Sequence, residues 1–389
     1  MARAGILYVS AAIEAQEDSP VKILQIAPLW ESVPPPAYGG TEAVVHLLVE
    51  ELVRQGHDVT LWASGDSKTS ARLRSCCPVS LRKAEEIQFK SLYSCQHAAL
   101  ALKEAPEYDI VHNHAGEEVM ALSQLVPVVP TLTTMHCLIT ADTKFVWDRY
   151  EGYFNNISWS QRRLMPEISG ATFAGVAYNG IDVSSFPFQR DKQDHLLFLS
   201  RMSPEKGPEQ AIEVARRTGR RLVMAGKVDP KDREYFKRVV EPRIDGKQII
   251  FKGEADGALK RELYREASCV LMPIDWEEPF GLVMPEAMAC GTPVIVFDRG
   301  AAREIVEHGE TGLVVSNVDE MVAAVDQVHQ IDPAYCRAYV QRRFDASVMA
   351  DRYLEVYESI IRRRVATTKV GIPSNAPEEK SELSPTHAA

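Results

Sequence analysis

The order of strand-like and helix-like segments restricts the fold of this chain more than any other feature. The segment Val21–Ala27 has the apolar composition of a buried strand, and Asp58–Ala63 has the same character. Between them, apolar residues recur at helical spacing from Thr41, and Gly56 ends that segment. A strand, a helix and a strand in this order form a βαβ unit, and such units predict a parallel sheet.

The alternation continues through predicted strands at Asp109–His112 and Val128–Thr133, and it starts afresh at His195–Ser200. The predicted elements that follow are helix Pro208–Arg217, strands Arg221–Ala225 and Gln248–Phe251, helix Leu259–Ala267, strand Cys269–Pro273, helix Leu282–Ala289 and strand Pro293–Phe297. We therefore expect an α/β protein of two facing Rossmann-like, doubly wound domains, 21–188 and 189–345, with a boundary near Pro187–Asp194. The 389 residues suffice for two such domains, and ligands normally bind in the cleft between them.

Both ends of the chain differ in composition from the two domains. A short apolar run, Gly5–Ile13, precedes three acidic residues and has no clear cleavage site. We interpret residues 1–20 as a non-structural leader or a misassigned start, and a secretory signal is the alternative. After Arg364 the composition turns to Pro, Ser and Glu, so residues 366–389 are expected to form a disordered tail.

Charge and cysteine usage disfavour several classes of function. The net charge of −10 disfavours binding to nucleic acid, which requires basic surfaces, and docking on an anionic membrane. No apolar run approaches the ~20 residues of a membrane span. The seven cysteines are scattered and form no C-x-x-C pair, so neither a disulfide framework nor a zinc site is predicted. These features favour a cytoplasmic protein.

The segment EPFGLVMPE, from Glu278 to Glu286, is the strongest indication of a ligand site. Eight residues of helix would span about 12 Å, which is the order of the distance between the hexose and the ribose of a sugar nucleotide. Glu278 can hold sugar hydroxyls and Glu286 can accept both ribose hydroxyls. Backbone N–H groups of Phe280, Gly281 and Leu282 open a predicted helix, where an anion can bind. Two solvated glutamates are the alternative for an isolated pair, but the FGL between them and the AMACGTPV that follows favour a site.

Two cations follow the first strand of the second domain. Arg201 and Lys206 lie five residues apart in SRMSPEKG, and we expect them to face the cleft. Transfer from a nucleotide sugar places negative charge on the departing diphosphate, and fixed Arg and Lys groups can stabilise that charge without a metal. For this segment alone, two surface cations with no ligand are an equally good interpretation.

Further candidates belong to the first domain. Gly39 and Gly40 precede a predicted helix, so the backbone can approach a diphosphate or sugar closely and the positive helix end points at it; an ordinary turn is the alternative. His136 follows a strand and can reach the cleft, where a neutral imidazole can donate to a sugar hydroxyl or another acceptor. His112 and His114 also end a strand, and we interpret those two as structural.

Together these residues resemble glycosyltransferase family 4, a family of retaining enzymes with the GT-B fold. The resemblance covers about Val21–Arg364 and rests on YGGTE, DIVH, the strand end at His136, NGID, R-x4-KG, EPFGLVMPEAMACGTPV and residues 300–306, of which EPFG is the most specific. It implies that Arg201 and Lys206 bind the distal phosphate. It also implies that Glu286 binds the ribose, and that Glu278 with Phe280–Leu282 binds the transferred sugar.

The resemblance carries further expectations. It places Gly40 against phosphate or sugar and His136 beside the reacting sugar, and it implies a helix at about Ala346–Arg364 that crosses back to the first domain. The family implies retention of anomeric configuration, no divalent metal and no other cofactor. This chain departs from the family at Ala225-Gly226-Lys227, where a G-x-G is usual, so Lys227 is expected to alter donor preference.

The expected activity is transfer of a hexose from a nucleoside diphosphate sugar, UDP-hexose in preference to GDP-hexose, to a hydroxyl acceptor. Acceptor contacts are expected on loops Ser32–Ala37 and Leu138–Arg163. Another GT-B sugar enzyme, an epimerase or a phosphorylase, is one alternative, although a phosphorylase needs a pyridoxal phosphate lysine and this chain is short for one. A non-catalytic sensor of nucleotide sugars is the other, because binding and transfer use the same side chains.

Overall fold

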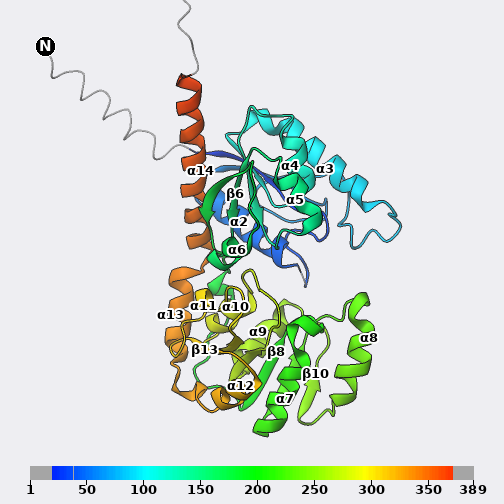
Figure 1. The fold of residues 1–389 in the computed structure, drawn as a ribbon, viewed down its shortest axis with the longest axis vertical. Coiled ribbons are helices and arrows are strands. Elements are labelled where there is room, and N and C mark those ends of the chain that lie inside the picture. The colour runs from blue at the N-terminus through cyan, green and yellow to red at the C-terminus, as the bar shows by residue number, and fades with distance from the viewer. Residues whose placement is uncertain (1–19, 38, 371–389) are drawn as a thin grey trace, which may run out of the picture.

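The protein has two parallel β-sheets, one in each half of the chain (Figure 1). The computed structural model describes residues 20–37 and 39–370. The first sheet has seven strands in the order β3-β2-β1-β4-β5-β6-β7, and the second has six in the order β10-β9-β8-β11-β12-β13. Every strand pair in both sheets is parallel. Two Rossmann-like α/β units are therefore present, as the alternation of elements predicts.

The elements of the two domains have the following bounds. The first sheet consists of β1 Lys22–Ile26, β2 Asp58–Trp62, β3 Arg72–Arg74, β4 Ile110–Asn113, β5 Thr131–Met135, β6 Tyr153–Asn156 and β7 Thr172–Val176. Its helices are α2 Gly40–Arg54, α3 Lys90–Glu104, α4 Glu117–Ser123, α5 Ala141–Trp147 and α6 Trp159–Leu164. The second sheet consists of β8 His195–Leu199, β9 Arg221–Ala225, β10 Ile249–Phe251, β11 Cys269–Met272, β12 Val294–Phe297 and β13 Gly312–Val315. The remaining helices are α7 Pro208–Thr218, α8 Arg233–Tyr235, α9 Gly257–Glu266, α10 Val283–Ala289, α11 Ala302–Ile305, α12 Val318–Val325, α13 Pro333–Arg343 and α14 Ala346–Val370.

Strand β1 shows how the first sheet is covered on both faces. Successive side chains of a strand point to opposite faces. Ile23 belongs to the apolar cluster that includes α2 and α14, whereas Leu24 and Ile26 belong to the cluster that includes α3, and all three are fully buried. The second sheet lies in one continuous core with side chains of α7, α10 and α12. Both faces of each sheet are thus used for packing, which leaves the carboxyl ends of the strands for ligands.

Two chain segments cross between the domains side by side. The backbone N–H of Ile181 donates to the carbonyl oxygen of Phe344 at 2.8 Å, and the N–H of Ala346 donates to the carbonyl oxygen of Ile181 at 2.9 Å. Helix α14 begins there and runs back along the first domain, where it packs against α2 and β7 (Figure 1). Its buried face carries, at the i, i+3, i+4, i+7 spacing of one helix side, Tyr353, Val356, Tyr357 and Ile360. The helix expected to cross back is therefore present.

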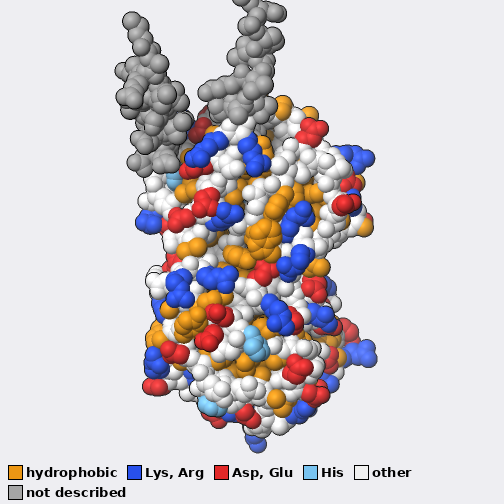
Figure 2. Space-filling view, turned by 60° about the vertical axis from the view of Figure 1, so that its left-hand side comes forward, with side chains coloured by type: hydrophobic (Ala, Val, Ile, Leu, Met, Phe, Trp, Pro, Cys, Tyr) orange, Lys and Arg blue, Asp and Glu red, His pale blue; other side chains and the backbone are white. Residues whose placement is uncertain are grey.

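The space-filling view shows two lobes that meet at a narrower waist (Figure 2). Basic and acidic side chains are interspersed over this face rather than gathered into a patch of one sign. Within the two described ranges, no helix combines the length and the apolar content needed to cross a lipid bilayer.

The structure differs from the expectation in the first domain and near the C-terminus. The segment Leu138–Arg163, expected to be a loop, contains α5, β6 and α6. Strand β6 escapes a prediction based on apolar patterns because it ends in Asn155 and Asn156, whose polar side chains are fully buried. Helix α14 continues to Val370, past the position where the disordered tail is predicted to begin. The predicted leader lies, apart from residue 20, outside the described residues, as does the tail after residue 370.

We expect Ile360→Ala to destabilise the protein, because Ile360 is only 2% exposed in the apolar cluster between α14 and α2. Removing buried methylene groups from such a site costs about 2–5 kcal/mol in the free energy of unfolding. Ser359→Ala, one residue away on the exposed side of the same helix, is the control and should change that free energy little. Denaturant unfolding measures both variants, and equal stability of the two would contradict this packing of α14.

Candidate functional site

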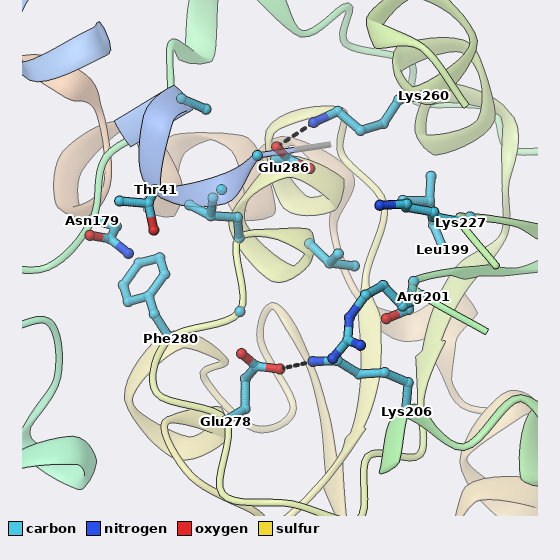
Figure 3. A pocket seen from close by; sticks show the side chains of 18 of the residues that line it. Thr41, Asn179, Leu199, Arg201, Lys206, Lys227, Lys260, Glu278, Phe280 and Glu286 are labelled. Carbon is cyan, nitrogen blue, oxygen red and sulfur yellow. Dashed lines mark hydrogen bonds and ion pairs between the residues drawn. The ribbon is translucent and has the colours of Figure 1, made fainter. Parts of the chain in front are cut away.

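A cavity of about 390 Å³ lies between the two domains and is lined by residues of both. Every site residue predicted from the sequence lines it: Gly39, Gly40, His136, Arg201, Lys206, Glu278, Phe280, Gly281, Leu282 and Glu286. The structure thus brings together two motifs from the second domain and two positions from the first. Figure 3 shows the cavity, with Glu278 and Glu286 at opposite ends of the drawn group and with Arg201 and Lys206 on one side of it.

The first domain contributes the start of helix α2. Gly39 has a φ of 152°, and a Cβ atom there would lie only 2.7 Å from Cβ of Pro35, so a side chain has no room at this turn. Helix α2 begins at the next residue, Gly40, close to the predicted start. A Cβ on Gly40 would lie 3.6 Å from Cδ1 of Leu282, so the helix start faces the second domain. The backbone N–H groups of this first turn have no partners within the helix and suit an oxyanion.

Glu278 is held in a loop by contacts on two sides. Lys206 donates from Nζ to Oε2 of Glu278 at 2.5 Å, and Trp276 donates from Nε1 to the same oxygen at 3.0 Å. The Lys206 ammonium also lies 4.6 Å from the centre of the Trp276 ring. Gly300 packs directly on the backbone of Glu278, where a Cβ would lie 2.2 Å from the carbonyl oxygen of Glu278. Side-chain contacts therefore hold the carboxylate of Glu278, and the close packing of Gly300 holds its backbone.

Arg201 and Lys227 lie among carboxylates of their own domain. Arg201 is 3.0 Å from Glu205, 3.6 Å from Asp229 and 3.8 Å from Asp232. Lys227 is 2.8 Å from Asp229. Burial raises the pKa of Asp229, but hydrogen bonding and attraction to Lys227, together with the Arg201 charge, keep it below the ordinary aspartate value. Both cations are thus oriented by ion pairs at the cavity wall, and Lys227, singled out as a departure from the family pattern, does line the cavity.

Glu286 is held by two groups from helix α9. Lys260 donates from Nζ to Oε1 at 2.6 Å, and the hydroxyl of Tyr264 donates to Oε2 at 2.9 Å. Burial, and then the charge of Glu286, raise the pKa of Tyr264 well above its ordinary value, so this phenol keeps its proton. Glu286 is 8% exposed and lines the cavity. A fixed carboxylate of this kind suits a pair of neighbouring hydroxyls.

The loop between the two glutamates corrects one detail of the prediction. Helix α10 begins at Val283, with Leu282 as its N-cap, so Phe280 and Gly281 precede the helix rather than open it. The reason is the φ of 82° at Gly281, a left-handed conformation that cannot continue into a right-handed helix. The 12 Å estimate for eight helical residues therefore does not apply. The Phe280 ring is buried against Tyr178 and Phe344, so its side chain is mainly part of the core.

His136 lies at the first-domain wall of the cavity, as predicted. Its Nε2 is 2.9 Å from Nδ1 of His114, and burial lowers the pKa of His136 to about 4. The imidazole is therefore neutral at ordinary pH. His112 and His114 are buried and do not line the cavity, in keeping with their interpretation as structural, although His114 touches His136 directly.

Sequence patterns missed several cavity residues. Trp276 lies two residues before Glu278 and lines the cavity, but no sequence pattern predicts a role for it. Lys260 lies 26 residues before Glu286, and only the packing of α9 on α10 brings the two together. Asn179 and Thr41 also line the cavity from the domain junction and from α2.

The chain matches two family models, one in each domain. The model described as "Glycosyltransferase Family 4" matches residues 38–172, and the model described as "Glycosyl transferases group 1" matches residues 183–342. The chain is 27% identical over 352 residues to an uncharacterized glycosyltransferase of Methanocaldococcus jannaschii, with 77% of this chain and 87% of that protein covered. It is 28% identical over 286 residues to the phosphatidyl-myo-inositol mannosyltransferase of Mycolicibacterium smegmatis, with 65% and 72% covered.

Among solved structures, HepE of Anabaena in complex with UDP and glucose is similar to this chain with a TM-score of 0.68 at 17% identity, covering 87% of this chain and 100% of that one. This likeness shows the fold, which is GT-B. The first family match contains Gly39, Gly40 and His136, and the second contains the cations and both glutamates. Because the two matches span both walls of the cavity, the chain belongs to the group 1 glycosyltransferases, in glycosyltransferase family 4.

Proposed function

We propose that this enzyme transfers a hexose from a UDP-hexose to a hydroxyl acceptor with retention of the anomeric configuration. The observation that carries the proposal is the order of charged groups along the cavity. Glu278 lies at one end beside Lys206, Arg201 lies near them, and Glu286 lies at the other end (Figure 3). A sugar nucleotide has the same order of hexose, phosphates and ribose.

The leaving diphosphate determines what the cations do. Transfer breaks the bond between the anomeric carbon and the oxygen of the distal phosphate, so negative charge grows on that phosphate. Arg201 and Lys206 are positioned before the reaction by their carboxylate partners, and such fixed charges stabilise the transition state without reorganising. Two cations at this place can do the work of a divalent metal. Among the residues that the structure describes, no group of three or more His, Cys, Asp or Glu side chains is arranged to hold a metal ion.

The donor nucleotide that we propose is UDP. The Anabaena neighbour is described with UDP and glucose, which supports UDP-hexose, whereas the mycobacterial relative is a mannosyltransferase, so GDP-hexose is the alternative donor. Lys227, which is expected to alter donor preference, lines the cavity together with Glu254 and Ala255. A thermal-shift screen with UDP- and GDP-sugars discriminates the donors, because a ligand that binds only the folded state raises the melting temperature.

Three other functions use the same cavity, and simple measurements separate each of them from transfer. A phosphorylase would carry pyridoxal phosphate, whose absorbance band is visible in the purified protein, and an epimerase would interconvert nucleotide sugars without releasing UDP. A sensor would bind a nucleotide sugar without cleaving it. Slow release of UDP from UDP-glucose in the absence of acceptor favours the transferase over all three.

We expect Glu278→Ala and Glu286→Ala to fail differently. Glu286 is assigned to the ribose, so its removal should weaken binding of free UDP about tenfold to a hundredfold, the usual range for hydrogen bonds to a charged group. Glu278 is assigned to the transferred sugar, so its removal should lower turnover strongly while UDP affinity stays near that of the wild type. Calorimetry with UDP and steady-state kinetics with UDP-glucose measure the two effects.

Glu262→Ala is the matched control for this pair, because Glu262 is exposed on helix α9 and does not line the cavity. It should bind and turn over like the wild type. Unchanged UDP affinity in Glu286→Ala would rule out the ribose assignment, and unchanged turnover in Glu278→Ala would rule out the sugar assignment.

We expect Arg201 and Lys206 to act as a unit on the leaving phosphate. Loss of either cation should lower kcat/KM on the order of a hundredfold. The double variant Arg201→Ala, Lys206→Ala should be less damaging than the product of the two single effects, because both charges stabilise one developing charge. Arg201→Lys keeps the charge but loses the planar fork, so it should remain impaired.

Lys237→Ala, which removes an exposed cation elsewhere in the same domain, is the control and should keep full activity. If both single alanine variants keep most of their kcat/KM, the phosphate assignment is wrong. The wild type should also stay active in EDTA, and loss of activity that magnesium or manganese restores would show that the two cations are not sufficient.

A further inference from the structure

A continuous chain of buried polar side chains runs through the first domain and ends at His136. Neighbouring strands supply Gln25 from β1, His112 from β4, Thr134 from β5 and Asn155 from β6, and helix α14 adds the hydroxyls of Tyr353 and Tyr357. All of these side chains are at most 3% exposed. A buried row of this kind has no water with which to exchange partners, so each proton must be placed on a definite atom.

At Asn155, the end of the row farthest from His136, the contacts determine which atom donates each hydrogen bond. The amide nitrogen of Asn155 lies 3.4 Å from the backbone carbonyl oxygen of Asn156 and 3.3 Å from the hydroxyl of Tyr353. A carbonyl oxygen can only accept, so the amide nitrogen must face it and the amide oxygen must face away. That oxygen lies 2.6 Å from the hydroxyl of Thr134. The single proton of Thr134 is therefore donated to Asn155.

The donors at His112 and Tyr357 follow from the position of the Thr134 proton. Nε2 of His112 lies 2.6 Å from the Thr134 oxygen, and because that oxygen has already used its proton, Nε2 must donate. Burial lowers the pKa of His112 well below its ordinary value, so this ring is neutral and its Nδ1 carries a lone pair. Tyr357, whose hydroxyl lies 2.6 Å from that Nδ1, must donate to it. The Tyr357 oxygen then accepts from the amide nitrogen of Gln25 at 3.0 Å.

The orientation of the Gln25 amide then determines the donors at His114 and His136. Since its nitrogen faces Tyr357, its oxygen faces Nε2 of His114 at 3.0 Å, and Nε2 must donate. Burial also lowers the pKa of His114 well below its ordinary value, so the ring is neutral and its Nδ1 accepts. The atom 2.9 Å away is Nε2 of His136, which therefore carries the proton. Among the described residues, Nδ1 of His136 has no hydrogen-bond partner.

We propose that this chain of hydrogen bonds holds His136 as the neutral Nε2–H tautomer, with Gln25 and His114 as positioning residues, so that Nδ1 of His136 accepts a hydrogen bond from a hydroxyl of the sugar in the cavity. The tautomer follows from the fold alone, and the contact with sugar rests on the proposed function. The sequence suggests an imidazole that donates to the sugar, whereas the network leaves it an acceptor. The same argument gives α14 a role, because Tyr353 and Tyr357 connect the row.

The tautomer is tested on the ligand-free full chain by two-bond ¹H–¹⁵N correlation spectra of protein labelled at histidine. Such spectra distinguish a ring nitrogen that carries a proton from one that does not, and the His136→Gln spectrum assigns the signals. We expect a protonated Nε2 and an unprotonated Nδ1 at His136. A protonated Nδ1 in the wild type would overturn the proposal without the need for any further variant.

The positioning role is tested with His114→Leu and His114→Gln. Leucine removes the acceptor, so both tautomers of His136 should appear and kcat/KM for hydrolysis of UDP-glucose should fall about tenfold. The amide of glutamine can accept from His136 and donate to Gln25, so it should restore both the spectrum and most of the rate. His97→Gln is the matched control, because His97 is buried in the same domain and bonds only to the Ala27 carbonyl oxygen.

A normal tautomer and rate in His114→Leu would overturn the positioning role. The contact itself is tested with UDP-glucose analogues in which one sugar hydroxyl at a time is replaced by fluorine, which accepts but cannot donate. We expect one fluoro analogue to be cleaved by the wild type as slowly as the corresponding deoxy sugar, and its loss of rate to be small in His136→Leu, whose side chain cannot accept a hydrogen bond; equal losses in both proteins at every position would overturn the contact. If no nucleotide sugar is cleaved at all, the proposed function fails, while the spectra still decide the tautomer.

Discussion

Helix α14 returns to the first domain and packs against α2 and β7, so the chain joins its two domains twice. The chain leaves the first domain once, builds the second domain, and comes back beside the segment by which it left, with Ile181 bonded to both Phe344 and Ala346. Because α14 then packs along α2 with a full apolar face, the two sheets present their carboxyl ends to the same cavity.

Within the cavity, the charges are already paired before any ligand arrives. Lys206 holds Glu278, Lys260 holds Glu286, and Arg201 lies among three carboxylates. Ordering a flexible, exposed cation when a ligand binds costs conformational entropy. These cations are already ordered by their ion pairs in the folded protein. A bound diphosphate adds negative charge to a site whose cations are partly balanced, so the binding free energy is the difference between two sets of ion pairs.

Much of the fold and of the site could be predicted from the sequence because both depend on local patterns. The βαβ alternation gives two parallel sheets, and the carboxyl ends of their strands bring Arg201 and Lys206 from one sheet, and His136 from the other, to the cavity between them. What could not be predicted depends on contacts between distant residues. Lys260 reaches Glu286 only because helix α9 packs on α10. Strand β6 ends in buried asparagines, and Thr134 and Tyr353 supply hydrogen-bond partners for Asn155. The start of α10 depends on one backbone angle at Gly281, and the role of His114 on a row of protons across four strands and a helix.

In the function that we propose, this cavity cleaves a nucleoside diphosphate sugar and keeps the configuration of the anomeric carbon. The most direct measurement is the ¹H NMR spectrum of the hexose that is first released when the enzyme hydrolyses a UDP-α-hexose, recorded before the free sugar equilibrates between its anomers. We expect the α-anomer to appear first, together with stoichiometric UDP. First appearance of the β-anomer would contradict retention, and the absence of cleavage of every UDP- and GDP-sugar that raises the melting temperature would contradict the transferase itself.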